Sequence, residues 1–301
     1  MDIFVLEAIV AELQQRLTGA RINKVHQPGS DTVLLRLWTG RGEERLLLSA
    51  APGEGRLHLT ATSLPNPPHP LRFCQLLRAR LSRLLAIRQL PQERIVELLF
   101  RGTQGEELRL LAEFAGPQSN LLLVDADGVI IDLLQRVAAP VGRRELLPGL
   151  PYQLPHPLPG ISLADPLPLL AAEGGEPHSF RAWLLREVRP MSPLMARELA
   201  TRVAAGAEAQ QVLADFRRQW LARDFQPLIG ELERKRVLSA FPLPALALAA
   251  VEEFASPSAA VESFYASTQS AAVGGRGEMV ALLRRELKRL DKRLLRIEEE
   301  S

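Results

Sequence analysis

Apolar residues recur three or four positions apart at the start of the chain, at Ile3, Leu6, Ile9, Val10, Leu13 and Leu17. This spacing places them on one face of a helix, and it predicts a helix over residues 2–17. Asp2 is suited to cap the first turn of this helix, and Gly19 is suited to end it.

Short apolar runs separated by turn residues follow, and they predict strands. The runs occupy residues 32–38, 44–50, 56–62, 94–100, 107–114, 120–126 and 128–134. Glycine-bearing segments such as TGRGE, RGTQG and DADG separate several of them. Regularly spaced strands with such turns are typical of an antiparallel sandwich or barrel. We therefore predict an α+β fold class for residues 1–150, with two helices packed against strands.

The second of these helices is predicted after a proline-rich segment. Pro67, Pro68 and Pro70 restrict the backbone just before the residues LRFCQLLRARL. On a helical wheel the apolar residues share an arc of about 120°; they are Phe73, Cys74, Leu77, Leu81, Leu84 and Leu85. The arc is bordered by Arg72, Arg78, Arg80 and Arg83. This edge of the helix either faces phosphates or is simply a solvated surface.

The second half of the chain predicts different elements. Proline is dense across residues 148–168, so we interpret residues 151–177 as a connection. Helical periodicity returns over 178–236, where Ser192 and Pro193 match an N-cap and a first helical residue. Residues 237–275 show no clear period and form a connecting segment. A heptad spacing over 276–301 predicts the start of a coiled coil, with an ordinary amphipathic helix as the alternative.

Charge is distributed unevenly. The net charge of the chain is +2, but residues 1–101 contain 14 basic and 9 acidic residues, which gives +5. The basic residues are arginines except for Lys24, Lys235, Lys288 and Lys292. Arginine suits two-pronged contacts with phosphate. A GC-rich genome would produce the same bias without any function.

The sequence lacks the residues that several classes of chemistry require. Cys74 is the one cysteine, so neither a disulfide framework nor a cysteine-rich zinc site is possible. The histidines have no metal-ligand spacing, and no phosphate-binding loop motif occurs. No apolar run reaches about 18 residues and no secretion signal is visible, so we expect a cytosolic protein without a membrane span. We predict no catalytic residues, no metal, no cofactor and no small-molecule substrate.

An ordered series of segments resembles one known family. These segments are MDIFVLEAIVAEL, LTGARINKVHQP, LLLSAAPGEGRLHLT, PNPPHPLRFCQLLRARL, QLPQERIVELLF, AEFAGPQSNLLLVD, LLPGLPY and SPLMAREL. Together they resemble the NFACT family, often labelled fibronectin-binding protein A-like. The resemblance implies that residues 1–150 form the NFACT N-terminal domain, similar to the N-terminal fold of formamidopyrimidine-DNA glycosylases. It also implies a helix-hairpin-helix-like domain over 178–236 and a coiled-coil arm beginning at 276–301.

The resemblance also implies a function. Family members bind large ribosomal subunits that carry stranded peptidyl-tRNA, recruit tRNA, and support C-terminal tailing of the nascent chain. The amino acid is alanine in bacteria, so alanine tRNA is the expected tRNA partner. The ribosome forms the peptide bond, and the protein is a non-enzymatic RNA-binding factor.

Two family motifs implied to contact tRNA can be placed on this sequence. An Asp-Arg pair corresponds to Glu93 and Arg94, where the acid is one methylene longer. An E-x-x-G-[KR]-x-S-N turn corresponds to Glu113, Gly116, Ser119 and Asn120, with Pro117 in place of the cation. A further possible RNA-facing edge is basic and consists of Arg21, Lys24, Arg72, Arg78, Arg80 and Arg83.

Two other functions are alternatives to this one. A fibronectin-binding adhesin is suggested by the family's older label, but it requires export. A DNA glycosylase shares the expected fold, but such enzymes use a proline after the initiator methionine and a following glutamate. Asp2 and Ile3 occupy those positions here, so a glycosylase is disfavoured.

Overall fold

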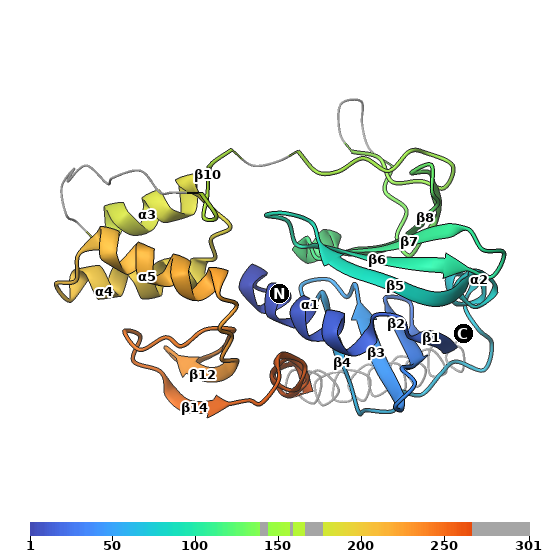
Figure 1. Ribbon diagram of the computed structural model, residues 1–301, viewed down its shortest axis with the longest axis horizontal. Coiled ribbons are helices and arrows are strands. Elements are labelled where there is room, and N and C mark those ends of the chain that lie inside the picture. The colour runs from blue at the N-terminus through green and yellow to red at the C-terminus, as the bar shows by residue number, and fades with distance from the viewer. Residues whose placement is uncertain (139–143, 157–158, 166–176, 267–301) are drawn as a thin grey trace, which may run out of the picture. The chain divides into compact units, whose positions relative to one another are not determined.

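The computed structural model describes residues 1–138, 144–156, 159–165 and 177–266 (Figure 1). The chain divides into two compact units, Met1–Ala260 and Val261–Ser301, and all labelled elements lie in the first. The predicted coiled coil at 276–301 lies outside the described residues. Among the described residues no helix is long and apolar enough to cross a lipid bilayer.

The first unit contains a nine-stranded antiparallel sheet in the order β4-β3-β2-β1-β5-β6-β7-β8-β9. Its strands are β1 (Arg21–Gly29), β2 (Thr32–Trp38), β3 (Glu43–Ser49), β4 (Arg56–Leu59), β5 (Leu81–Gln89), β6 (Ile95–Gly102), β7 (Glu107–Glu113), β8 (Asn120–Val124) and β9 (Ile130–Leu133). The predicted mixed fold with antiparallel strands is confirmed, and each predicted strand has a counterpart in this sheet.

The helix α2 (Arg72–Arg80) is shorter than predicted. Residues 81–85 were expected to continue it, but they begin β5, so that expectation is wrong. The apolar spacing of Leu81, Leu84 and Leu85 fits a helix, yet β5 pairs along its length with β6 and these bonds determine the conformation. A bulge between Leu84 and Ala86 disturbs the two-residue alternation that would have indicated a strand. Arg83 therefore lies on a strand.

The helix α1 (Ile3–Leu17) lies at the centre of the first unit. Asp2 caps it, because the Phe4 N–H donates to Asp2 Oδ1 over 2.9 Å, as predicted. The helix packs against β5 and β4, and its apolar residues are buried on more than one side. The ring of Phe4 meets Phe216 and Phe241 edge-to-face, with centroids 5.3 and 5.9 Å away. This aromatic cluster joins α1 to the second half of the chain.

The second half is built from short helices and strands. Its elements are β10 (Ile161–Ser162), α3 (Pro177–Glu187), β11 (Val188–Arg189), α4 (Pro193–Ala204), α5 (Ala209–Leu221), β12 (Leu228–Leu232), β13 (Lys235–Ser239) and β14 (Ala249–Glu253). Ser192 caps α4 as predicted, since the Met195 N–H donates to its Oγ over 3.2 Å. The strands β12 and β13 form a hairpin that begins in the region predicted to be helical, 178–236, and ends in the predicted connecting segment, 237–275.

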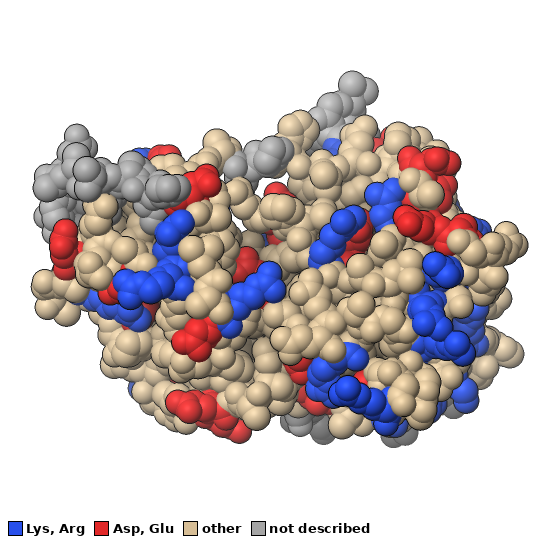
Figure 2. All heavy atoms as spheres, in the orientation of Figure 1, with Lys and Arg blue, Asp and Glu red and all other residues tan. Residues whose placement is uncertain are grey.

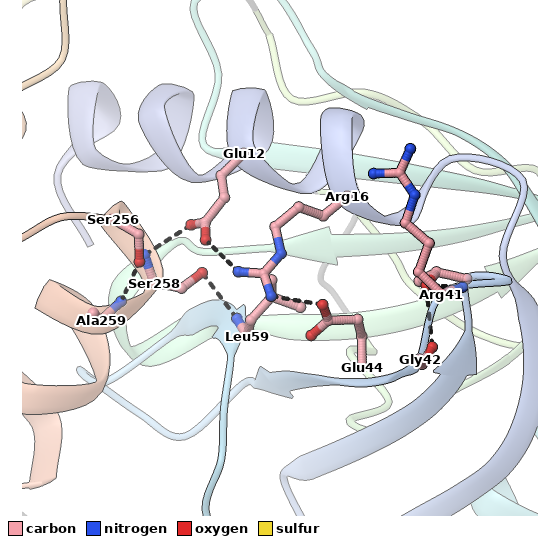
Figure 3. A network of polar contacts seen from close by, with 10 residues as sticks. Glu12, Arg16, Arg41, Gly42, Glu44, Leu59, Ser256, Ser258 and Ala259 are labelled. Atoms are coloured by element: carbon pink, nitrogen blue, oxygen red, sulfur yellow. Dashed lines mark hydrogen bonds and ion pairs between the residues drawn. The ribbon is translucent and has the colours of Figure 1, made fainter.

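A polar network ties the end of the first unit to its beginning (Figure 3). The Ser258 N–H donates to Glu12 Oε2 over 2.9 Å, and the Ser258 hydroxyl accepts a 3.0 Å hydrogen bond from the Leu59 N–H. Glu12 also pairs with Arg16, which reaches Glu44 at 2.6 Å. The Leu59 bond matters because β4 is an edge strand, and the backbone groups on its outer side have no neighbouring strand to pair with.

Glu7 makes the packing of α1 against α5 sensitive to pH. The Trp220 Nε1–H donates to Glu7 Oε2 over 2.5 Å, and burial raises the pKa of Glu7 to about 7. Between the ordinary pKa of 4.5 and this value, the folded protein binds a proton that the unfolded chain has released. Stability from this group is therefore greatest below pH 4.5 and falls as the pH rises to about 7.

We expect Glu7→Gln to stabilise the protein by about 2 kcal/mol at pH 8 and to change little at pH 5, because glutamine keeps an acceptor without a buried charge. Thermal unfolding of both proteins at the two pH values measures this. Glu145→Gln, at an exposed carboxylate, is the control. An equal effect of Glu7→Gln at both pH values would contradict the assignment.

Candidate nucleic-acid interface

Three arginines lie directly opposite one another on neighbouring strands. The sheet register pairs Arg21 of β1 with Arg83 of β5, and Arg83 with Arg101 of β6. Directly paired residues point to the same face of a sheet, and like charges so placed repel each other. None of the three forms an ion pair with any residue that the structure describes. The row therefore keeps a positive charge that the fold does not neutralise.

The same face carries further cations. Lys24 of β1 is opposite Arg36 of β2, which is opposite Arg45 of β3. A bulge between Ile22 and Lys24 inserts one residue into β1, so Arg21 and Lys24 share a face although they are three positions apart. Arg36 is partly neutralised by Glu43 at 2.6 Å. We call Arg21, Lys24, Arg36, Arg83 and Arg101 the basic strand face.

An exposed tryptophan adjoins these cations. Trp38 is paired with Arg21 across the β1–β2 ladder and remains 46% exposed. A large aromatic ring beside arginines can stack on an unpaired nucleotide base.

The pKa of His26 indicates that the local electrostatic potential is positive. Burial lowers the pKa of His26, and Arg78, Arg36 and Lys24 lower it further by repelling the imidazolium. Figure 2 shows Lys and Arg side chains gathered on the right-hand side, where Figure 1 places α2 and β1. This part of the molecule is therefore suited to a polyanion.

The arginines of α2 are engaged differently. Arg72 pairs with the buried Asp132 of β9 at 2.5 Å, and Arg80 pairs with Glu106 at 3.1 Å. The Nε–H of Arg78 donates to the Val25 carbonyl over 2.8 Å. These side chains hold α2 on the sheet. Of the basic edge predicted from the sequence, Arg21, Lys24 and Arg83 are the ones without such partners among the described residues.

Sequence reasoning missed Arg36 and Arg101 as members of this face and Trp38 beside it. Arg36 and Trp38 are aligned by the pairing of β1 with β2, and Arg101 by the pairing of β5 with β6. A strand assignment for residues 81–89 would have revealed the row, but the helical interpretation hid it.

The predicted Glu93-Arg94 pair lies in the tight turn between β5 and β6. The Glu93 N–H donates to the Leu90 carbonyl over 3.1 Å, and the Gln89 amide donates to the Glu93 carbonyl over 2.9 Å. Gln92 has a left-handed backbone with φ of 62°. Pro91 followed by a residue with positive φ matches a type II β-turn. Glycine is preferred at the second of the two central positions of such a turn, which Gln92 occupies here. The turn holds Arg94 at an exposed position.

The structure brings both family motifs to one edge of the sheet. The Phe114 N–H donates to the Arg94 carbonyl over 2.9 Å, and Ile95 is paired with Glu113. Arg94 forms no side-chain ion pair within the described part of the chain. Burial raises the pKa of Glu93, while Arg94 and Arg144 draw it back down. We call Glu93, Arg94 and the turn at 115–118 the Arg94 edge.

Glu113 is buried beneath this edge. It accepts two hydrogen bonds from Arg144, at 2.8 and 2.5 Å, and a third from the Tyr152 hydroxyl at 2.7 Å. Arg144 also lies over the Tyr152 ring, 5.0 Å from its centroid. With Leu146 packed on the sheet nearby, these contacts fasten residues 144–152 across β7 to β9. Glu113 therefore positions the edge, and its carboxylate is not presented to solvent.

The remaining motif residues are also internal. The Ser119 hydroxyl donates to the Gly116 carbonyl over 2.8 Å, and the Asn120 amide donates to the Gln135 carbonyl over 2.7 Å. Both side chains are buried. Gly116 has φ of 64° at the start of the 3-10 turn η1 (Gly116–Gln118). A part for these residues in tRNA binding stays a prediction, and the geometry supports shaping of the turn rather than direct side-chain contact.

No cluster of three or more metal-ligating side chains occurs among the residues that the structure describes.

Comparisons with known proteins identify relatives across the chain. A family model described as "NFACT N-terminal and middle domains" matches residues 2–301. A protein of Streptococcus pneumoniae serotype 2 named "Rqc2 homolog RqcH" is 37% identical over 162 residues, which are 51% of this chain. Its counterpart in Bacillus subtilis is 36% identical over 170 residues, or 54% of this chain. In each case the match spans 29% of the relative's own length.

A solved structure has the same fold. It is described as the N-terminal part of the fibronectin/fibrinogen-binding protein from Streptococcus suis. It superposes with a TM-score of 0.72 at 25% identity, covering 88% of this chain and 98% of the other.

We expect Arg144→Met to destabilise the protein by about 3 kcal/mol, because the buried Glu113 carboxylate loses its charged partner. Adding Glu113→Gln should restore most of this loss, since the charge is then removed from both sides. Urea unfolding of the two single variants and the double variant measures the coupling. Arg136→Met, at an exposed arginine, is the control. A double variant no more stable than Arg144→Met would contradict the buried pair.

Proposed function

Because the chain belongs to the NFACT family, we propose that it is a non-enzymatic RNA-binding factor of ribosome-associated quality control. In this proposal it binds obstructed large ribosomal subunits that carry peptidyl-tRNA, recruits tRNA in the cytoplasm, and supports C-terminal alanine tailing of the stalled chain. The names of the relatives from Streptococcus pneumoniae and Bacillus subtilis support the quality-control role. The glycosylase-like N-terminal fold, the helix-hairpin-helix and the coiled coil stay predictions.

The observation that carries the RNA-binding part is the row Arg21–Arg83–Arg101. Cross-strand repulsion between like charges destabilises a sheet, so a row without acid partners is best explained by an external anion. Arginine binds phosphate with two parallel hydrogen bonds. A sheet face with arginines on neighbouring strands suits the backbone of folded RNA, which is recognised mainly by shape and phosphate.

The Arg94 edge supplies a second contact. Arg94 is exposed, and the carboxylates near it are either tied to Arg144 or set back in the turn. Pro117 takes the place of a cation in this edge, so Arg94 contributes a larger share of its positive charge. We assign the Arg94 edge to tRNA and the basic strand face to RNA phosphate in general.

Adhesion to fibronectin is the second candidate, because the superposed Streptococcus suis protein carries that name. The two functions differ in location and in sensitivity to salt. Salt-sensitive co-purification with large ribosomal subunits favours RNA binding, whereas labelling on the surface of intact cells favours the adhesin.

We expect Arg94→Ala to lower the amount of tRNA in purified complexes several-fold while binding to large ribosomal subunits survives. The reason is that the change removes one exposed phosphate contact without touching a buried ion pair. Quantitative RNA sequencing of the co-purified material measures both RNAs. Arg136→Ala is the matched control. Unchanged tRNA recovery from the Arg94→Ala complex would refute the assignment of this edge.

We expect the triple variant Arg21→Gln, Arg83→Gln, Arg101→Gln to bind RNA more weakly and to be at least as stable as the parent. Loss of three phosphate contacts should make the slope of log affinity against log salt shallower by roughly 2–3. Filter binding of tRNA and of large subunits at several salt concentrations measures the slope. The control removes the same charge elsewhere, with Arg136→Gln, Arg186→Gln and Arg218→Gln. Equal slopes for the two triple variants would argue against the basic strand face.

A further inference from the structure

The hairpin β12–β13 turns through two charged residues with an unusual backbone. Leu232 is paired with Lys235, so Glu233 and Arg234 alone form the loop. Their φ angles are 51° and 65°. Positive φ at both central residues is the mark of a type I′ turn, in which Asn-Gly is strongly preferred. This sequence instead has a glutamate and an arginine there.

This choice destabilises the hairpin. A residue with a Cβ is strained in the left-handed region, and here two such residues are adjacent. Strain that persists at an exposed turn often accompanies a function for the residues that bear it. Both side chains are exposed, so burial in a core does not account for them.

The acid of the turn is paired with an arginine outside the turn, so it does not neutralise the two cations that follow it, Arg234 and Lys235. Glu233 is held by an ion pair with Arg197 of α4, whose hydrogen bond is the first cause of the lowered pKa of Glu233. Lys235 adds a weaker attraction to the same carboxylate. Arg234 and Lys235 are exposed, and neither forms an ion pair with a residue that the structure describes. We call Arg234 and Lys235 the hairpin tip.

The shape of the hairpin tip restricts the ligand. A small anion needs donors that converge on it from several directions. The end of a two-residue hairpin is convex, and its donors diverge. Two adjacent cations on a convex end fit an extended polyanion, whose successive charges lie along a line.

We infer that the hairpin tip contacts the phosphate backbone of a folded RNA, separately from the basic strand face and the Arg94 edge. This inference rests on the proposed RNA-binding function and adds a contact from the second half of the chain. The RNA is either tRNA or the ribosomal RNA of the large subunit, which offer the same chemistry.

The test replaces Arg234 by glycine and Lys235 by glutamine in the full 301-residue chain. Glycine removes a cation and also relieves the strain of a positive φ, so this variant should unfold at a higher temperature than the parent. RNA binding should nevertheless weaken by about tenfold at low salt, which is the effect of roughly two phosphate contacts. A gain in stability together with a loss of binding excludes unfolding as the cause.

The control variant is Arg186→Gln, Arg218→Gln, which lowers the net charge equally at two exposed arginines. Binding is measured to purified tRNA, to purified large ribosomal subunits and to poly-glutamate. A selective loss for tRNA or for large subunits supports the inference and identifies the RNA. Equal affinities of test and control variants for both RNAs would overturn it, as would a loss confined to poly-glutamate.

Failure of the proposed function gives a different result. If the parent protein binds neither RNA, the RNA-binding proposal itself fails. If the parent binds and the hairpin variant binds equally well, the hairpin inference alone fails.

Discussion

The pairing of β1 with β5 joins the two halves of the large sheet, and two backbone hydrogen bonds at the end of α1 reinforce it. The Gly19 N–H donates to the Leu84 carbonyl over 2.8 Å, and the Leu84 N–H donates to the Ala20 carbonyl over 2.9 Å. Gly19 has φ of 85°, so glycine is needed to direct the chain from α1 into β1 at this point. The junction fixes the register that sets Arg21 against Arg83. A structural requirement at the end of α1 thereby determines where the positive charge of the sheet gathers.

Arginine has two separate uses in this protein, and the structure distinguishes them. The buried carboxylates Glu97, Glu113, Asp132 and Glu198 each have an arginine partner, and these partners are Arg88, Arg144, Arg72 and Arg202. An unpaired carboxylate in such a place would be costly, so these arginines are needed for folding. In the basic strand face, by contrast, Arg21, Lys24, Arg83 and Arg101 form no ion pair with any residue that the structure describes, and Arg36 pairs with the partly exposed Glu43. The arginine-rich composition is thus neither all functional nor all incidental.

The sequence allowed prediction of the elements whose stability is local. The cap at Asp2, the cap at Ser192 and the strand 32–38 all follow from nearby residues, and all three were predicted. Residues 81–85 were mispredicted because their apolar spacing fits a helix, while hydrogen bonds to β6 give them an extended form. Propensity is a weak guide where a partner strand supplies the bonds.

The candidate site, like the fold, was predictable only where it depends on neighbouring residues in the sequence. Two separate family motifs pointed to Arg94 and to Glu113, and the pairing of β6 with β7 brings the two motifs to one edge of the sheet. The motifs did not reveal that Glu113 is buried, because its partner Arg144 lies 31 residues further along the chain. Distant pairing of this kind decides whether a polar residue of a motif meets a ligand or holds the scaffold. Glu113 holds the scaffold, whereas Arg94 is exposed and forms no ion pair with a residue that the structure describes.

Strained turns occur just before Arg94 and at the tip of the β12–β13 hairpin. Gln92 precedes the Arg94 edge and Glu233 begins the hairpin turn, and both have the left-handed backbone that glycine or asparagine would adopt at lower cost. Each turn is braced by a side chain from outside it. The Gln89 amide donates to the Glu93 carbonyl in the first turn, and Arg197 pairs with Glu233 in the second. A braced turn loses little conformational freedom when it binds, so its cation is already in position for a phosphate. The strain and the bracing together favour turns that present arginine rather than turns that merely reverse the chain.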